Sequence, residues 1–483
     1  MKKTYIDTAM ERIAPDLILK GGNVVDVFSG KVIKADAIIK DGIICGVGSY
    51  SGENEQDVSG KYIMPGFIDS HVHIESSMTQ PSEYAKAVMP HGITTVIADP
   101  HEITNVCGED GLEFMLKSAE NIPLDVNLML PSCVPATPFE HTGANLDAKT
   151  TQKLAPKFFG IGEMMNYPGI VSGDDETLGK LCLDIVDGHA PLLSGHELDA
   201  YASAGIKTDH ECSVVEEMTE KISKGMYILL REGTLSLDVA KLIKGVTPYT
   251  LRRCAFCTDD RFVGEIIRDG SIDHCIRKAV SLGLNNIDAI IMATLNACEI
   301  YGMKNKGAIA PSYVADIVVA DDLNLSSISQ VYKNGKLVCE NGKALFECET
   351  VDNSKVTNTV HLPKISADFF KTDVKDKFDA IELIPESIIT KKVTVSYSDS
   401  LSKVCVIERH HNLGTKGIGF VTNYGITNGA IATSIGHDSH NVIVIGDNDS
   451  DMALAVNTLA TSGGIAVCSE GKVIASMTLD IAG

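Results

Sequence analysis

The stretch MPGFIDSHVH, residues 64–73, decides the fold of the larger part of this chain. It reads as a buried apolar strand that ends in two histidines, His71 and His73. Side chains at positions i and i+2 of a strand point to the same face, so both imidazoles face one side. Neutral imidazole is the commonest protein ligand for first-row metal ions. The stretch therefore predicts a metal site at the carboxyl end of this strand.

The composition is that of a large acidic protein with a sizeable core. The chain has 483 residues, a length that is enough for about three domains. Hydrophobic residues make up 44% of it, so a sizeable core can be buried and a disordered protein is not expected. Its 42 basic and 64 acidic side chains give a net charge of −22, which argues against non-specific binding to nucleic acid or to anionic membranes. The N-terminal segment has no apolar core of signal-peptide length, and no apolar run is long enough for a membrane helix. We therefore expect a cytoplasmic protein whose 13 cysteines are reduced thiols.

Apolar strand-like runs alternate with helical stretches through the middle of the chain, which predicts parallel βα units. Eight such runs can be counted: 67–73, 94–99, 125–130, 158–163, 184–189, 206–211, 226–232 and 253–260. Eight strands over this length predict a (β/α)8 barrel of the TIM type, in which the chemistry lies at the carboxyl ends of the strands.

Both flanks of this barrel show short strands separated by turn signals. Gly-containing pairs such as Asp41-Gly42 and Asn334-Gly335 predict hairpins. We therefore expect one small β-sandwich domain built from both flanks, with its first part at residues 1–62 and its returning part at residues 304–345. The barrel itself would span residues 63–303.

A polar stretch without clear periodicity, residues 346–365, is interpreted as a linker to an additional α+β C-terminal domain at residues 366–483. In this last domain Met452, Val456 and Leu459 share one face of an expected helix, which we expect to be capped near Ser450. The whole fold class is thus α/β, with a barrel, a small sandwich and an α+β domain.

Five of the expected strands end in a residue that can bind a metal ion. The six candidate ligands are His71, His73, Glu163, His189, His210 and Asp259. This set exceeds the three protein ligands of a single catalytic zinc and suits two ions. Our hypothesis places His71, His73 and Asp259 on one ion and His189 and His210 on the other, with Glu163 bridging both. Two such ions would activate a water as hydroxide, and Asp259 could take and return its proton.

These residues and their surroundings resemble the amidohydrolase superfamily and, within it, the adenine deaminases. The resemblance rests on FIDSHVHIESSM at 67–78, ADPHEITNVCG at 98–108, GEMMNYPG at 162–169, DGHAP at 187–191 and TDHE at 208–211, with further matches at 132–137, 229–234 and 410–421. It spans nearly the whole chain, including the C-terminal domain.

The resemblance implies a purine-salvage enzyme that converts adenine and water to hypoxanthine and ammonia. It also implies a binuclear centre of Mn²⁺ or Fe²⁺, with Zn²⁺ possible, and adenine as the small-molecule partner, without nucleic acid or membrane. We further expect a homo-oligomer. A neutral planar substrate needs a partly apolar pocket with a few fixed polar groups. The candidate polar residues in loops after the expected strands are Asp99, His101, Glu102, Arg231 and Glu232, with Glu102 as an additional proton shuttle.

The segment from Gly436 to His440 adds a further polar cluster in the C-terminal domain. Three interpretations stay open for it: a turn between strands, a cover over the barrel that sends His437 or His440 to the substrate, and an independent metal site.

Three other functions fit the sequence less well. Cyclic amide hydrolases such as dihydroorotases and hydantoinases share the barrel, but they usually bridge their ions through a carboxylated lysine where this chain has Glu163. A non-catalytic purine-binding barrel is disfavoured because all six candidate ligands are present. A nucleic-acid base deaminase is disfavoured by the acidic charge and by the missing H-x-E…P-C-x-x-C pattern.

Overall fold

The computed structural model describes residues 2–373, 376–385, 389–396 and 401–483. They form two compact units. The first unit comprises residues 1–99, 118–130 and 151–350, and the second comprises residues 100–117, 131–150 and 351–483. Within the described ranges, no helix combines the length and the apolar character that crossing a membrane requires.

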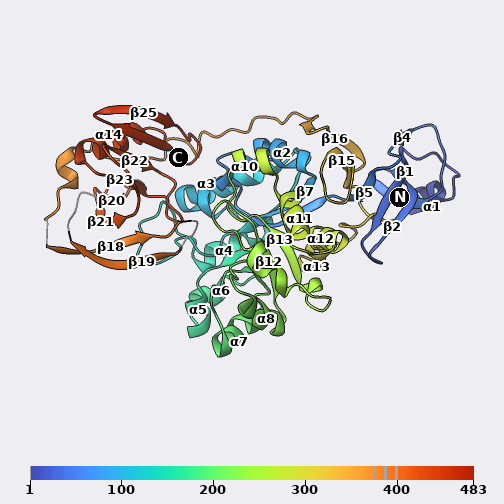
Figure 1. Cartoon of the computed structure of the whole chain (residues 1–483), viewed down its shortest axis with the longest axis horizontal. Helices are drawn as coiled ribbons and strands as arrows, with labels where there is room; N and C mark the ends of the chain where they lie inside the picture. The colour runs from blue at the N-terminus through green and yellow to red at the C-terminus, as the bar shows by residue number, and fades with distance from the viewer. Residues whose placement is uncertain (1, 374–375, 386–388, 397–400) are drawn as a thin grey trace. The chain divides into compact units, whose positions relative to one another are not determined.

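Eight parallel strands form the centre of the first unit (Figure 1). They are β6 (Phe67–Val72), β7 (Ile93–Ala98), β8 (Asp125–Leu130), β9 (Gly160–Met164), β10 (Val186–Gly188), β11 (Thr208–Asp209), β12 (Tyr227–Arg231) and β13 (Cys254–Cys257). β6 to β10 are neighbours in one sheet and β11 to β13 in another. The last strand returns to the first, since the Asp259 amide donates to the carbonyl of His71 at 3.0 Å. The predicted barrel fold is confirmed, and each of its eight strands overlaps one of the eight predicted runs.

Helices follow most of these strands and cover them. They are α2 (Pro81–Val88), α4 (Ala148–Leu154), α5 (Tyr167–Ser172), α6 (Asp175–Gly179), α7 (Gly195–Ser203), α8 (Val215–Ser223), α9 (Val239–Leu242), α10 (Val263–Asp269), α11 (Ile272–Ser281), α12 (Asn286–Ala293) and α13 (Leu295–Ile300). α11 illustrates the pattern, because its Ile272, Cys275, Ile276 and Ala279 recur at helical spacing and are buried. β6 has no exposed residue, as expected for a parallel strand covered on both faces.

The two flanks of the barrel together form a separate sheet of nine strands. Its strands are β1 (Leu17–Asp26), β2 (Lys31–Lys40), β3 (Ile43–Gly48), β4 (Glu55–Asp57), β5 (Tyr62–Pro65), β14 (Ile317–Ala320), β15 (Ile328–Lys333), β16 (Lys336–Glu340) and β17 (Lys343–Ala344), with α1 (Lys2–Ala9) beside them. β5 pairs with β1 on one side and with β14 on the other, which joins the two flanks. The hairpins at Asp41-Gly42 and Asn334-Gly335 have positive φ at both residues, as two-residue turns of this type require.

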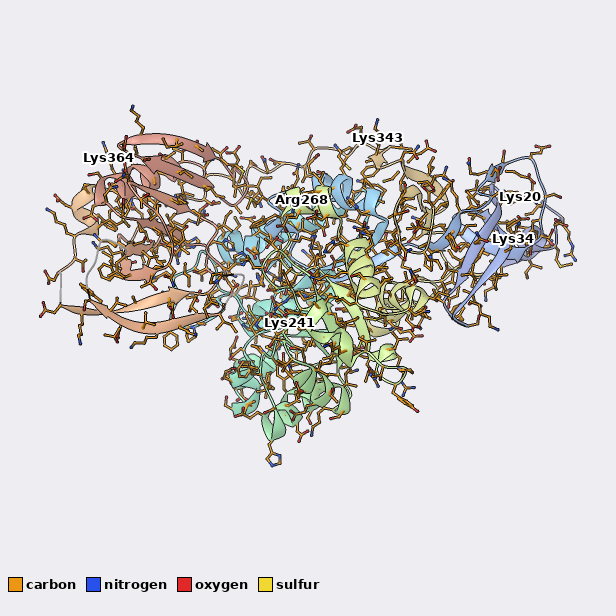
Figure 2. The ribbon with its side chains drawn as sticks, viewed as in Figure 1. Lys20, Lys34, Lys241, Arg268, Lys343 and Lys364 are labelled. Carbon is orange, nitrogen blue, oxygen red and sulfur yellow. The ribbon has the colours of Figure 1, made fainter. Side chains whose placement is uncertain are left out.

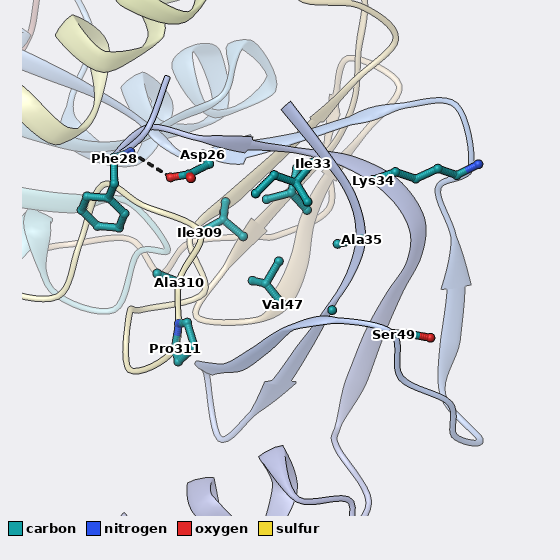
Figure 3. A pocket seen from close by; sticks show the side chains of 12 residues that line it. Asp26, Phe28, Ile33, Lys34, Ala35, Val47, Ser49, Ile309, Ala310 and Pro311 are labelled. Atoms are coloured by element: carbon teal, nitrogen blue, oxygen red, sulfur yellow. Dashed lines mark hydrogen bonds between the residues drawn. The ribbon is translucent and has the colours of Figure 1, made fainter. Parts of the chain in front are cut away.

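A pocket opens on this nine-stranded sheet (Figure 3). Ile33, Val47 and Ile309 contribute to its lining, and Lys34 extends away from it. The carboxylate of Asp26 accepts hydrogen bonds from the amides of Phe28 and Ser29 and is thereby used within its own turn. The pocket therefore offers no convergent reactive groups among its described lining residues.

A second β-rich body forms most of the second unit. Its strands are β18 (Lys377–Leu383), β19 (Thr390–Ser396), β20 (Ser402–Ile407), β21 (Lys416–Thr422), β22 (Gly429–Thr433), β23 (Val442–Gly446), β24 (Ile465–Ser469) and β25 (Lys472–Met477). α14 (Asp449–Leu459) packs on this sheet through Met452, Val456 and Leu459, which confirms the predicted buried face. α3 (His101–Ala119) lies in this unit up to Lys117.

Two details of the second unit differ from expectation. The cap of α14 lies two residues before Ser450: it is Asn448, whose side chain accepts from the amide of Asp451. Asn and Ser are both good caps, so the sequence Asn-Asp-Ser offers either residue for this role. The expected linker has no helix or strand, yet Val356 and Val360 are buried and the carbonyl of Val356 accepts from the amide of Ala482 at 2.6 Å. Its second half is therefore anchored to the last residues of the chain.

Charged side chains cover the outside of both units. Lys34, Lys343 and Lys364, on different parts of the chain, extend into solvent (Figure 2). Buried charged groups, in contrast, gather at the carboxyl ends of the barrel strands, where the candidate ligands lie.

Candidate metal centre

The six candidate ligands come together in the first unit. They lie in or directly after strands of the barrel: His71 and His73 at β6, Glu163 in β9, His189 after β10, His210 after β11 and Asp259 after β13. Their ligand atoms form overlapping groups of three within 4.8 Å. His189 is the most accessible of them, with 26% of its side chain exposed. Asp259 has a φ of 56°, a left-handed conformation that Asp tolerates better than most residues.

One group consists of His71, His73 and Asp259. The Nε2 atoms of the two histidines are 3.2 Å apart, and Asp259 Oδ1 lies 3.1 Å from His73 Nε2 and 3.6 Å from His71 Nε2. Two ligands of an ion at about 2.1 Å and the tetrahedral angle lie roughly 3.4 Å apart. The spacing of the three atoms therefore fits ligands that share one cation.

Glu163 faces two groups at once. Its Oε1 lies 3.3 Å from His73 Nε2, while its Oε2 lies 2.6 Å from His189 Nδ1 and 3.2 Å from His210 Nε2. The two groups adjoin, because the His210 ring stacks on the His71 ring with centroids 4.1 Å apart. A carboxylate whose two oxygens face different sets of ligands has the geometry that bridging requires.

The carboxylates change the titration of these histidines. Burial disfavours the charged ring of His71, but hydrogen bonding to Asp187 and Asp259 outweighs burial and raises its pKa to about 10. Burial likewise disfavours the charge on His189, and Glu163 outweighs it and raises the pKa to about 9. The surplus of negative charge around these rings is an environment that also attracts divalent cations.

Further polar groups support the candidate ligands from behind. Asp187 Oδ2 lies 3.6 Å from His71 Nδ1, and its Oδ1 accepts from Thr208 Oγ1 at 2.8 Å and lies 3.0 Å from Tyr301 Oη. A carboxylate behind the second nitrogen of a histidine fixes its tautomer and its ring orientation. His73 has a corresponding partner, because its Nδ1 donates to the carbonyl of Asp99 at 2.7 Å.

Two residues predicted to contact substrate, Asp99 and Arg231, also contact the candidate ligands. The side chain of Asp99 accepts from the amide of Glu163 at 2.9 Å. Arg231, 5% exposed, donates from Nη1 to Asp259 Oδ2 at 2.8 Å, and from Nε to Asp238 at 3.2 Å, and it also pairs with Glu211. These contacts hold Glu163 and Asp259 in place.

Glu232 is buried beside Lys278, whose ammonium group pairs with its carboxylate. Its backbone carbonyl accepts from Arg261 at 2.8 Å. A contact between Glu232 and a substrate stays a prediction.

The other candidates lie together in the second unit. Glu102 is buried, and its carboxylate lies 2.9 Å from His437 Nδ1 and 2.6 Å from His440 Nε2. His101 Nε2 lies 3.6 Å from the same carboxylate and 3.8 Å from Asp438. Burial disfavours the charge on Glu102, but the two C-terminal histidines outweigh it and hold its pKa well below the usual range. The segment at His437 is a turn, and this turn supplies partners to Glu102.

Sequence reasoning missed the supporting residues. Asp187, Asp209 and Lys221 are fully buried and bond to the backbone or side chains around His71, His189 and His210. A signal was present, because an aspartate stands two residues before His189 and directly before His210. The sequence around Lys221 gives no comparable signal, since Lys221 occupies an ordinary position of an amphipathic helix.

Comparisons with known proteins identify the family of this chain. The amidohydrolase family model matches residues 62–338, and the model of the adenine deaminase C-terminal domain matches residues 383–483. An adenine deaminase of Clostridium acetobutylicum is 47% identical, and the match covers 99% of this chain and 88% of that protein. Adenine deaminase 2 of Desulfotalea psychrophila is 45% identical over 100% of this chain and 87% of its own length.

Among solved structures, an enamidase of the amidohydrolase superfamily shares the fold with a TM-score of 0.52. It is 19% identical, and the match covers 68% of this chain and 97% of that chain. This likeness concerns the fold alone. The amidohydrolase model covers more than half of the chain and the relatives are similar over nearly its whole length, so the chain belongs to the adenine deaminases of the amidohydrolase family.

Proposed function

We propose that this chain catalyses the hydrolytic deamination of adenine to hypoxanthine and ammonia. The proposal is carried by one observation: in a chain of this family, Glu163 turns one oxygen to His73 and the other to His189 and His210. That arrangement suits a binuclear hydrolase better than a single-ion site.

The residues that would hold two divalent cations are the six candidate ligands. Carboxylate and imidazole donors accept several first-row ions, and we propose Mn²⁺ or Fe²⁺, with Zn²⁺ as the third candidate. When bound, such ions supply a Lewis acid that makes a water molecule a nucleophile at neutral pH.

Asp259 takes the central proton-carrying role in the proposal. It accepts the first proton of the water as the water oxygen bonds to C6 of the purine, and it later gives this proton to the amino group. The carbon–nitrogen bond then breaks and ammonia leaves. Arg231 supports the role, since its guanidinium beside Asp259 favours the ionised carboxylate that must accept the proton.

A second proton must move from the oxygen to N1 of the ring, which leaves the carbonyl of hypoxanthine. We propose Glu102 as its carrier, because an ionised carboxylate can accept a proton and pass it on. Asp99, His101, Arg231, Glu232 and His437 are kept as proposed adenine contacts.

The test is adenine turnover by metal-free protein reloaded with Mn²⁺, followed by the ultraviolet change to hypoxanthine and by released ammonia. We expect activity to reach a plateau at two ions per chain and to be lost in the Glu163→Gln variant. Glu216→Gln, an exposed glutamate on α8, is the matched control and should retain full activity. Metal uptake without ammonia would refute the function and direct the search to ring-opening substrates.

A further inference from the structure

Lys221 is a lysine buried completely inside the first unit. It lies in α8, and its side chain has 0% exposure. Its Nζ donates to the carbonyl of Ala190 at 2.6 Å, to Asp209 Oδ2 at 2.9 Å and to Glu217 Oε1 at 2.8 Å. An ammonium group has three donors, and all three are used here. A buried, fully bonded charge of this kind holds its neighbours in defined positions.

The partners of Lys221 lie next to two candidate ligands. Ala190 directly follows His189, and Asp209 directly precedes His210. Asp209 Oδ1 also accepts from the amide of Ala190 at 2.9 Å. Both backbone polar groups of Ala190 are therefore tied to the group formed by Asp209 and Lys221.

Glu217 extends the same connection to the loops beyond the ligands. Its Oε1 accepts from the amide of Leu192 at 2.7 Å, and its Oε2 accepts from the amide of Ser213 at 3.3 Å. The loop after β10 and the loop after β11 are thus joined through Lys221, Asp209 and Glu217, a group that we call the lysine clasp.

The clasp stands where the barrel lacks a continuous hydrogen-bonded sheet. In the part of the chain that the structure describes, β10 ends one sheet and β11 begins the other. At the opposite junction, between β13 and β6, backbone hydrogen bonds connect Asp259 to His71 and His73. At the β10–β11 junction, side chains make the connecting hydrogen bonds. One of them is Thr208, whose Oγ1 accepts from the amide of Gly188 at 3.0 Å.

We propose that Lys221 is a positioning residue that fixes the separation of His189 and His210 and thereby the affinity of one of the two ion positions. The position at which His189, His210 and Glu163 would hold an ion depends on two strands that the clasp joins. The position at which His71, His73 and Asp259 would hold an ion lies at the junction closed by the backbone and would not depend on the clasp. The inference rests on the proposed metal centre but is independent of which substrate the centre acts on.

The experiment titrates Mn²⁺ into metal-free full-length protein and measures the dissociation constants of both positions by calorimetry with a competing chelator. Lys221→Arg keeps the charge, but the planar guanidinium group of arginine cannot direct three hydrogen bonds to the same acceptors as the ammonium group does. The double variant Lys221→Met with Glu217→Gln removes one charge of each sign and leaves the net charge of the clasp unchanged. Lys224→Met is the matched control, because Lys224 ends the same helix and pairs with Asp199 at the surface at 2.7 Å.

We expect one position to weaken about 10- to 100-fold in both clasp variants, as for other partners of metal ligands, while the second position and the control keep wild-type affinity. Wild-type affinity at both positions in Lys221→Arg would overturn the proposal, and so would an equal loss at both. If the double variant does not fold, the arginine variant decides alone. Wild-type protein that binds two ions without deaminating adenine would refute the proposed function and leave this measurement valid.

Discussion

Replacing Arg231 with lysine separates two roles for this side chain. The sequence predicted a contact with adenine, whereas the structure shows Arg231 bonded to three carboxylates. Lysine keeps the positive charge but offers a single ammonium group on a shorter reach, so it cannot serve Asp238 and Asp259 together. The contact with Asp259, made by the far end of the guanidinium at 2.8 Å, is the one that we expect to be lost.

The size of the effect follows from that single lost contact. A hydrogen bond between charged groups contributes about 1.5–3 kcal/mol. If Asp259 must be held in place to carry its proton, a loss of about 2 kcal/mol lowers kcat roughly 30-fold at 1.4 kcal/mol per factor of ten. If Arg231 acts by holding Asp259 and not by contacting adenine, KM should change little. Removing the charge altogether, in Arg231→Met, would leave buried carboxylates uncompensated and destabilise the fold by about 3–5 kcal/mol.

The assay is steady-state adenine turnover with both ion positions loaded and metal content measured for each sample. Arg268→Lys is the matched control, because Arg268 is exposed and pairs with the adjacent Asp269 (Figure 2). A raised KM with unchanged kcat would refute the positioning role and support the contact with adenine that the sequence predicted.

Three further predictions concern protons and buried hydroxyls. The pKa values of His71 (about 10) and His189 (about 9) are raised, so both rings carry protons when no metal is bound. Metal uptake should therefore release protons, and it should weaken as the pH falls. Calorimetry in buffers of different ionisation enthalpy measures the number of protons released. Burial and the neighbouring Arg409 lower the pKa of His410 from 6.5 to about 4. The stability that depends on the neutral ring is therefore present above pH 6.5 and is lost as the pH falls from 6.5 towards 4. Between pH 7.5 and 5 the loss is about 2 kcal/mol, and hydrogen exchange in β20 and β21 should reveal it in the wild type but not in His410→Gln. Tyr301→Phe removes a hydroxyl that donates to the carbonyl of Ser70 at 2.6 Å, and urea unfolding followed by circular dichroism should show a loss of about 1–3 kcal/mol.

The strands and the candidate ligands could be predicted because they depend on local patterns. An apolar run such as residues 67–72 is buried on both faces, and its end places His71 and His73 at the rim whatever the rest of the chain does. The same holds for the hairpin at Asn334-Gly335, where two residues set the turn.

The supporting contacts could not be predicted because they join residues far apart in sequence. Nothing near Arg231 reveals that it reaches Asp259, 28 residues later. Lys221 has the sequence context of any helical lysine, and only the packing of α8 shows that it is buried. The assignment of residues 100–117 and 131–150 to the second unit is equally hidden, since it depends on which body those loops contact.

The second unit is built from stretches that are far apart in the sequence, so the ribosome makes its parts at different times. Asn441 donates to the carbonyl of His141 at 2.8 Å across 300 residues of chain. At about 5–20 residues per second, the ribosome makes the later residue roughly 15–60 s after the earlier one. The loop around His141 therefore emerges long before its partners exist. Nascent chains arrested before residue 351 should leave this loop open to proteases, and the delay gives chaperones a defined interval in which to act.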